Sequence, residues 1–527
     1  MKRALAVLIV ILMTATLLYA TGQGEAAGPA GSTTVRVQLF DRGTDGGRTR
    51  VDDNAWTSWI REKALRDLNL NVVFFPVGRW TENTDIINLM AAGAAPDLCY
   101  TYNSAMISSF RDQGGILDLA PRLNLLPDAR RLLGDDPAFP GTDFILRNMQ
   151  PDGRMYSIPS YRIALAQRNI FIRKDWLDTL GLRVPQTTAE FEAALRAFRD
   201  RDPGNVGRNN VIPFAQDYDA RWGLANLIQP SITPNVSDRD RYIHSVADRN
   251  VFFPGYVDGV RMMNRWYNEG LLFRDFPLMT VADDFYNLIK SGFVGAFSGN
   301  WDLPYRGDYN ILADLRRNVP NADFVPVDAI QSSDGVTRKD MFDKVGLQVF
   351  VPAFSRAPDA ALRYLNWLCI PENYTFLQIG QAGVNHQMNN GIPELMTRPA
   401  NDPWMQNSAQ NIDFTMLMNG IETGNHDNNI RVLALSYGGF SSDVIVNAYN
   451  TSTRNARAPV VVNVPTSQDG VYGQTIRDKV DALLAQSITA NPADFERVWQ
   501  AGMTDLLQSG GQAIMDERRT IADRFFR

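Results

Sequence analysis

The fold is decided by TVRVQLF at Thr34–Phe40, followed by NVVFFP at Asn71–Pro76 and DLCY at Asp97–Tyr100. Their β-branched and aromatic residues are typical of strands. Apolar residues spaced three and four apart predict a helix after the first strand, and Thr84–Ala92 predicts a second helix that stops at Gly93. This alternation of strand and helix indicates an α/β fold of the doubly wound kind.

Ligands of such sheets bind beyond the carboxyl ends of the strands. In this chain those positions are Asp41–Gly47, after the first strand, and Thr101–Ser104, after the third. Both loops carry polar and aromatic side chains, so they are the first candidates for a binding site.

The same pattern continues further along the chain. We expect strands at Asn169–Arg173, Phe293–Phe297 and Val345–Pro352. Thr187 and Glu190 have the spacing of a capping box at the start of another helix. No internal repeat or coiled coil is present. A chain of this length is too long for one compact core, so it is expected to form two to four domains or lobes.

Composition limits the class of function. The 527 residues include 52 Lys+Arg and 58 Asp+Glu, which gives a formal charge of −6 and argues against a nucleic-acid partner. Two Cys cannot form a four-Cys zinc site. We expect Cys99 and Cys369 to be buried free thiols, with a long-range disulfide as the alternative.

The N-terminus has the layout of a secretory signal peptide. Lys2 and Arg3 precede an apolar run, and small residues follow it up to a cleavage position after Ala20. The segment 1–20 is therefore expected to be a signal peptide and 21–33 a flexible tether. An uncleaved membrane anchor is the alternative. No Cys lies near the cleavage position, so we expect no lipoprotein anchor and a periplasmic or extracellular protein.

A search for catalytic motifs finds almost none. The chain has neither a P-loop nor a dinucleotide-binding glycine motif, and its three His lack metalloprotease spacing. GAFSG at Gly295–Gly299 places its serine one position too late for a nucleophile elbow. Two placed carboxylates could still make a glycosidase, which the sequence leaves open.

Several aromatic residues lie beside polar groups in predicted loops. Sugars present apolar C–H faces to aromatic rings and hydroxyl rims to Asp, Asn or Arg, so this mixture favours a polar, ring-shaped solute. For any single Trp, core packing is the competing role. The candidates are Tyr102 with Asn103, Tyr161 with Arg162, Trp222, Trp301 with Asp302, and Tyr305.

Six segments in this order resemble landmarks of the extracellular solute-binding proteins of ABC importers, in particular the large carbohydrate-type subgroup. No single segment is decisive, but together they extend over nearly the whole mature chain. They are LMAAGAAPDL at Leu89–Leu98, GILDL at Gly115–Leu119, DGRMYSIP at Asp152–Pro159, the run Ile172–Pro203, WYNEGL at Trp266–Leu271 and the closing segment Ala493–Glu517.

The resemblance implies two α/β lobes joined by hinge strands, with a solute cleft between them and an importer's permease subunits as partners. We expect lobe one at 34–160 plus 324–387 and lobe two at 161–323 plus 388–527, with crossings near Pro159 and Pro326. A monomer is expected that meets the membrane only through the transporter.

The resemblance also implies binding without catalysis or cofactor. Asp41, Arg42, Tyr102 and Asn103 would line one wall of the cleft, and Tyr161 is a further ligand-binding candidate. Trp222, Trp301 and Asp302 would face them. His386, in GQAGVNHQM at Gly380–Met388, would lie near the cleft or be a satisfied core histidine.

Many relatives carry a calcium loop after the capped helix. Here the segment Asp202–Val211 reads DPGNVGRNNV, with Gly204, Val206 and Val211 where oxygen ligands are expected. We therefore expect no metal ion.

Two other functions stay open. A secreted polysaccharide-degrading enzyme would turn over a glycosidic substrate. A binding protein for peptides or amino-sugar compounds would depend more on Arg42 and Arg162 than on ring stacking.

Overall fold

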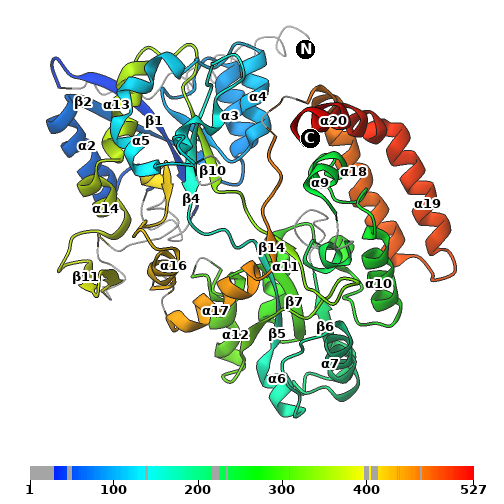
Figure 1. Ribbon diagram of the computed structural model, residues 1–527. Helices are drawn as coiled ribbons and strands as arrows, with labels where there is room; N and C mark the ends of the chain where they lie inside the picture. Colours follow the sequence, from blue (N-terminus) through cyan, green and yellow to red (C-terminus); the bar gives the residue numbers. More distant parts are fainter. Residues whose placement is uncertain are drawn as a thin grey trace, which may run out of the picture.

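The computed structural model describes residues 29–43, 50–136, 140–216, 225–232, 236–307, 309–396, 403–404, 413–435, 437, 439–462, 464 and 466–526. The expected signal peptide, most of the tether and Trp222 lie outside these residues. Within them the chain forms two lobes, each with a sheet wrapped by helices (Figure 1). Both the α/β class and the two-lobed architecture are thereby confirmed.

Four strands of the first lobe, β1 to β4, share one direction. β1 and β2 form a parallel pair, and Val37 of β1 bridges in parallel to Leu98, next to β3. β10 runs antiparallel to both β3 and β4 and lies between them. The carboxyl ends of β1, β2, β3 and β4 therefore meet at one edge. The strands are β1 (Thr33–Asp41), β2 (Leu70–Gly78), β3 (Cys99–Thr101), β4 (Ile158–Arg162), β10 (Val345–Phe350) and β13 (Met418–Asn419).

The second lobe has a four-stranded sheet in the order β6, β7, β5, β8. β5 is antiparallel to both neighbours, whereas β6 and β7 are parallel. Its strands are β5 (Arg168–Arg173), β6 (Ile212–Ala215), β7 (Val294–Asn300) and β8 (Phe324–Val327). The remaining described strands are β9 (Lys339–Asp340), β11 (His386–Asn389), β12 (Ile392–Leu395) and β14 (Ala456–Arg457).

Helices cover both sheets. Those around the first sheet are α2 (Ala55–Leu68), α3 (Glu82–Ala91), α4 (Ser104–Asp112), α5 (Pro127–Leu133), α13 (Pro358–Leu368) and α14 (Pro371–Ile379). Those around the second sheet are α6 (Lys174–Thr179), α7 (Thr188–Arg201), α8 (Ala225–Ile228), α9 (Asp238–His244), α10 (Tyr256–Asn268), α11 (Ala282–Lys290), α12 (Ile311–Asn318), α17 (Ser442–Thr453), α18 (Ser467–Thr489), α19 (Phe495–Leu506) and α20 (Gln512–Phe525). α16 (His426–Leu435) contacts α17 and β12.

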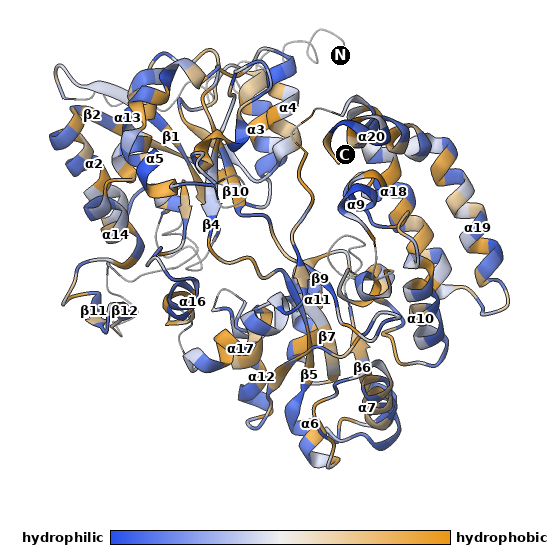
Figure 2. Cartoon of the chain, viewed as in Figure 1, coloured by the Kyte–Doolittle hydropathy of each residue, from blue (hydrophilic) through white to orange (hydrophobic). Residues whose placement is uncertain are grey.

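Two apolar cores hold these layers together. One packs around the first sheet and continues to the side of the second sheet covered by α11, α12 and α17. The other joins the opposite side of that sheet to α7, α10 and the three C-terminal helices. Helices such as α18 and α19 carry both hydrophilic and hydrophobic residues, as one-sided burial requires (Figure 2).

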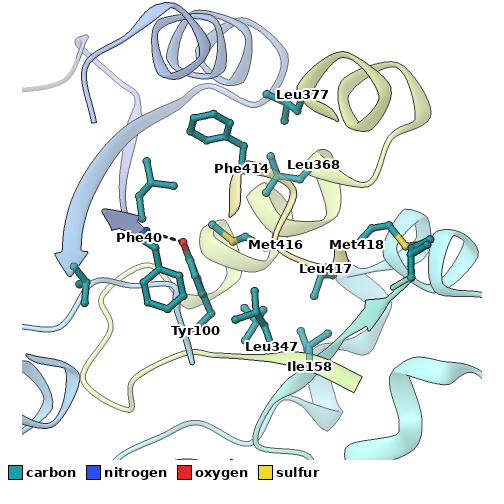
Figure 3. Close-up of a cluster of buried hydrophobic side chains, with 14 of the residues drawn as sticks. Phe40, Tyr100, Ile158, Leu347, Leu368, Leu377, Phe414, Met416, Leu417 and Met418 are labelled. Carbon is teal, nitrogen blue, oxygen red and sulfur yellow. Dashed lines mark hydrogen bonds between the residues drawn. The ribbon is translucent and has the colours of Figure 1, made fainter. Parts of the chain in front are cut away.

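The interior of the first lobe includes a segment from late in the chain. Phe414, Met416 and Met418 are buried near Leu347 of β10 (Figure 3). In the same cluster the backbone N–H of Phe40 donates to the Tyr100 hydroxyl at 3.0 Å, which ties β1 to β3. Residues 413–419 therefore belong to the first lobe in space.

The chain crosses between lobes at 163–167 and at 328–344, close to the crossings expected near Pro159 and Pro326, and a third time between β13 in the first lobe and α17 in the second. The first two crossings are joined where the N–H of Phe342 donates to the carbonyl of Leu165 at 2.8 Å. β9, in the second crossing, pairs with β14.

Two lobe assignments differ from expectation. β8, at 324–327, hydrogen-bonds to β5 in the second sheet instead of joining lobe one. β13, expected in lobe two, pairs with β4 in the first sheet. Strand pairing decides which lobe each of these strands belongs to, and the local sequence pattern does not encode that pairing.

The predicted cap of α7 is half formed. The Thr187 hydroxyl accepts from the Glu190 N–H at 3.2 Å, as expected for an N-cap. The Glu190 carboxylate accepts from the N–H of Gln186 at 2.8 Å instead of that of Thr187. Each group still satisfies one free N–H at the helix start.

Candidate functional site

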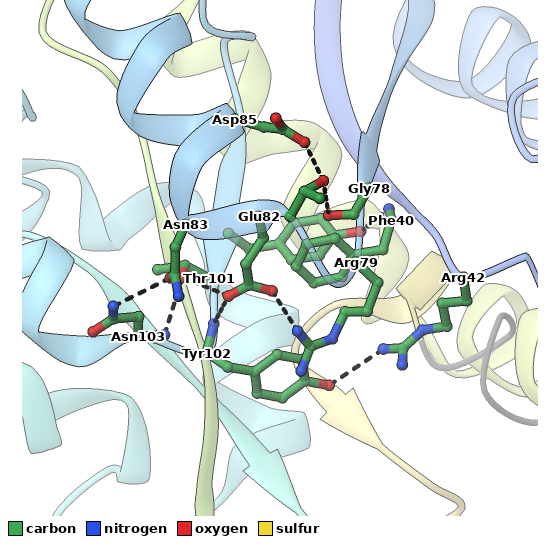
Figure 4. Close-up of polar contacts among 12 residues, drawn as sticks. Phe40, Arg42, Gly78, Arg79, Glu82, Asn83, Asp85, Thr101, Tyr102 and Asn103 are labelled. Carbon is green, nitrogen blue, oxygen red and sulfur yellow. Dashed lines mark hydrogen bonds and ion pairs between the residues drawn. The ribbon is translucent and has the colours of Figure 1, made fainter. Parts of the chain in front are cut away.

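Three arginines surround Tyr102 at the shared edge of the first sheet. We call Arg42, Arg79 and Arg162 the arginine cluster. Arg42 follows β1, Arg79 follows β2, Tyr102 follows β3 and Arg162 ends β4, so parallel strands bring all four together. The guanidinium carbons of Arg79 and Arg162 lie 4.3 Å and 5.8 Å from the Tyr102 ring centroid. Arg42 Nη2 is 3.5 Å from the Tyr102 hydroxyl (Figure 4).

Arg42 is neutralised by a buried acid. Its Nε and Nη2 donate to the two carboxylate oxygens of Asp413 at 2.6 Å and 2.8 Å. Burial alone would lower the pKa of Arg42, but the charge and hydrogen bonds of Asp413 raise it above its ordinary value. Arg42 is therefore a fixed positive charge.

Arg79 is held by Glu82 in the first turn of α3. Arg79 Nη1 donates to Glu82 Oε2 at 2.8 Å. The other carboxylate oxygen accepts from the Thr101 hydroxyl at 2.9 Å and from the Tyr102 N–H at 3.1 Å. Glu82 is buried, so this network fixes Arg79 and Tyr102 relative to each other (Figure 4).

Arg162 has no such acid. Among the described residues it forms no salt bridge, and its Nε has no hydrogen-bond acceptor. Its guanidinium carbon lies 4.3 Å from the centroid of the Phe342 ring, on the second crossing segment. Burial lowers its pKa, and nearby Arg79 adds to this effect, whereas Tyr102 and the carboxylate of Asp343 partly oppose it. Among the described residues, the cluster therefore contains one guanidinium without a directly paired carboxylate, beside the point where the lobes are joined.

Trp80 places an exposed aromatic ring beside the cluster. It is 69% exposed, and the Arg79 guanidinium carbon lies 5.0 Å from its ring centroid. An exposed ring next to charged hydrogen-bond donors can stack on the apolar face of a sugar.

Trp80 and Arg79 were missed by the sequence analysis because the second strand was expected to end at Pro76. β2 continues to Gly78, so Arg79 and Trp80 come directly after it. The signal that identified Arg42 and Tyr102, a polar or aromatic residue just beyond a parallel strand, would have found both.

The other predicted residues of this wall have local roles. Asp41 is exposed, and its carboxylate accepts from the N–H of Gly43 at 3.0 Å. Asn103 is the N-cap of α4, accepting from the Ala105 N–H at 3.1 Å. Both residues still lie at the edge of the first sheet where β1 to β4 end and where Tyr102 lies, which we call the Tyr102 edge.

Tyr161 points away from Tyr102. Its ring packs against Phe144 with centroids 5.1 Å apart, while Arg162, the next residue of β4, lies against Tyr102. Successive side chains of a strand face opposite sides, so these two cannot share one face. Of the pair Tyr161 and Arg162, the arginine joins the site.

Of the residues predicted to face this wall from lobe two, Trp301 and Asp302 are described, and both are buried. Trp301 is only 7% exposed and packs edge-on against Tyr449, with centroids 5.5 Å apart. The Tyr437 hydroxyl donates to Asp302 Oδ2 at 2.5 Å. Core packing, the alternative considered for a single Trp, therefore describes Trp301. The ligand contacts of Trp222, which lies outside the described residues, stay a prediction.

His386 is a buried histidine with a hydrogen-bond partner, which was the alternative to a place near the cleft. It is 4% exposed at the start of β11, and its Nδ1 lies 3.2 Å from the carbonyl oxygen of Ile379. None of its contacts with described residues reaches the arginine cluster.

The segment Asp202–Val211, which lies where relatives carry a calcium loop, is held closed by hydrogen bonds from its own backbone N–H groups. The Asp202 carboxylate accepts from the N–H groups of Val206 and Gly207 at 2.9 Å and 2.8 Å. In the parts of the chain that the structure describes, no three His, Cys, Asp or Glu side chains form a metal-binding group.

Over the same described residues, no helix combines the length and the apolar character required to span a bilayer. Cys99 and Cys369 are buried free thiols, as expected.

Comparison with known proteins places this geometry in a familiar architecture. Over 94% of its length the chain superposes, with a TM-score of 0.68 and 12% identity, on 99% of the Streptococcus pneumoniae ABC-transporter substrate-binding protein FusA in complex with kestose. The fold is that of a two-lobed solute-binding protein. No protein-family model matches the chain.

Two sequence relatives are named for the saccharides that they bind. The chain is 24% identical over 217 residues to the polygalacturonan/rhamnogalacturonan-binding protein YtcQ of Bacillus subtilis, a match covering 40% of each chain. It is 23% identical over 198 residues to the fructooligosaccharide ABC transporter substrate-binding protein FusA, covering 35% of this chain and 36% of the relative. The chain thus spans about two fifths of the length of these relatives.

Proposed function

We propose that this protein is the substrate-binding component of an ABC importer and captures an oligosaccharide between its two lobes without catalysis. The observation that carries the proposal is the convergence of four parallel strand ends on Tyr102, beside the segments that join the lobes. The sugar-binding names of the relatives and the two-lobed fold support it.

In this mechanism the first lobe supplies the recognition wall. Trp80 stacks on a sugar ring, and the guanidinium groups of Arg79 and Arg162 donate to oxygens on its rim. Asp41 and Asn103 border the same wall and extend it to further hydroxyls. The second lobe closes over the solute, and binding favours the closed arrangement because only that arrangement contacts the solute from both sides.

The protein would act outside the cytoplasm as a monomer. The leader at 1–20 directs export and is removed, and the closed, loaded form docks on the importer's permease subunits. The permeases are identified by this role alone.

The test is a binding screen on the mature chain. Thermal shift and calorimetry against neutral and acidic oligosaccharides, short peptides and free monosaccharides should show saturable binding of an oligosaccharide. Small-angle scattering should show a smaller radius of gyration when it is bound. Chromatography of the recovered sugar should show it intact, and a cleaved product would establish the enzyme in place of the binding protein.

A further inference from the structure

Resting on the proposed function, we infer that the oligosaccharide is acidic and that Arg162 binds its carboxylate. The class of ligand follows from a charge count at the Tyr102 edge. The arginine cluster brings three guanidinium groups to one ring, and the described residues supply two buried acids, Asp413 for Arg42 and Glu82 for Arg79. The third arginine has no carboxylate within ion-pair distance among the described residues, so its positive charge is open to a ligand.

Arg162 is the group that carries this charge. It lies against Tyr102 on one side and Phe342 on the other, at 5.8 Å and 4.3 Å. These rings hold the guanidinium plane, and its Nε has no acceptor among the described residues. A planar fork with free donors matches a carboxylate through two parallel hydrogen bonds.

Arg79 provides a second donor toward the same ligand. Its Nη1 is engaged by Glu82, but its Nε also lacks an acceptor among the described residues. Both of these buried, unsatisfied donors belong to arginines that flank the Tyr102 ring. An anion between them would complete the hydrogen bonding of a site that is already rigid.

The neighbouring ring selects a saccharide over other anions. Trp80 is exposed beside Arg79, and a flat apolar surface next to a fixed cation suits a pyranose ring that bears a carboxylate. A simple inorganic anion would use the arginines and leave the ring unused. A uronic acid residue uses both.

The experiment compares matched acidic and neutral probes. Calorimetry at pH 7 measures binding of trigalacturonate, trimannuronate and a glucuronate-bearing xylotriose to the full mature chain, each beside its methyl ester. At least one acid should bind roughly 10- to 100-fold more tightly than its ester, the effect expected for a charge-assisted pair of hydrogen bonds.

The variant Arg162→Gln should abolish the preference for the acid: acid and ester should bind with equal affinity, both weakened by the loss of the donor that Arg162 offers to the sugar rim. The affinity of Arg162→Lys for the acid should lie between those of the parent chain and of Arg162→Gln, because lysine keeps the charge but loses the planar fork. Arg122→Gln is the matched control, because Arg122 lies on the same lobe in an exposed pair with Asp359. It should bind like the parent chain, and melting curves should show that all variants are folded.

The outcomes separate the two proposals. If an ester or a neutral trisaccharide binds as tightly as the acid, or if Arg162→Gln binds the acid normally, the charge inference is wrong and the proposed function stands. If no saccharide binds, both are wrong. Tighter binding of triglutamate than of every acidic sugar would make the ligand an acidic peptide.

Discussion

Arg42 and Asp413 form a two-point ion pair across 371 positions of the chain, with both N···O distances below 3 Å. The carboxylate is fully buried, and the arginine side chain is 12% exposed. The pair attaches the segment after Asp413 to the end of β1. It is thus both a support for the Tyr102 site and a long-range link in the first lobe.

Asp413→Ala should destabilise the protein by roughly 3–5 kcal/mol, because it leaves the buried Arg42 charge without a partner. Urea unfolding followed by circular dichroism measures this loss. Asp359→Ala, which breaks the exposed pair with Arg122, is the control and should cost about 0–1 kcal/mol. Equal losses in the two variants would show that the buried pair has no special role.

Trp80→Ala should weaken oligosaccharide binding roughly 2- to 12-fold, the worth of one aromatic stack, with the melting temperature unchanged. The ring is exposed, so its removal leaves no cavity. Phe525→Ala removes another exposed ring, 56% exposed at the end of α20, and should leave affinity unaltered. A Trp80 variant with full affinity would exclude the ring from the binding surface.

Neither cysteine should react with a thiol reagent in the native protein at pH 8. Burial raises the pKa of the Cys99 and Cys369 thiols, so the reactive thiolate is scarce and the reagent has no access. Absorbance with Ellman's reagent should register no thiol in buffer and both in guanidinium chloride. Rapid labelling of the native chain would contradict the burial of these side chains.

Gly510→Ala should destabilise the C-terminal helices by about 2–4 kcal/mol through backbone strain and overpacking. Gly510 has φ +116° between α19 and α20, and an added Cβ would meet Tyr472 Cγ at 2.3 Å. Chemical denaturation gives the measurement.

Gly470→Ala is the matched control for that substitution. Gly470 lies on the exposed surface of α18 with open space around its Cα, so alanine should stabilise the helix by up to about 1 kcal/mol. If both glycine variants are stabilised, the turn at Gly510 does not need its left-handed backbone.

The strands of the first lobe could be predicted because their pattern is local. β1, β2 and β3 all fall where apolar, β-branched runs indicated them. Their pairing could not be predicted in the same way. β10 pairs with both β3 and β4, and nothing within these short segments specifies which distant strand will lie between them.

The site was predictable to the extent that it obeys the rule for strand ends. Arg42 and Tyr102 follow predicted strands and do meet, whereas Arg79 was lost to a strand boundary two residues short. Trp301 also follows its strand directly, but its ring packs against Tyr449 from α17. That choice depends on a helix far along the chain, which a local pattern does not contain.

The position of β10 has a consequence for how the protein is made. A ribosome that has reached residue 340 has synthesised β3 and β4 but not the strand that hydrogen-bonds to both. The first lobe must therefore wait, with part of its sheet incomplete, while most of the chain of its neighbour is translated. Such late, long-range closure slows folding and prolongs the exposure of unpaired strands, which is compatible with passage through an export channel before folding is complete.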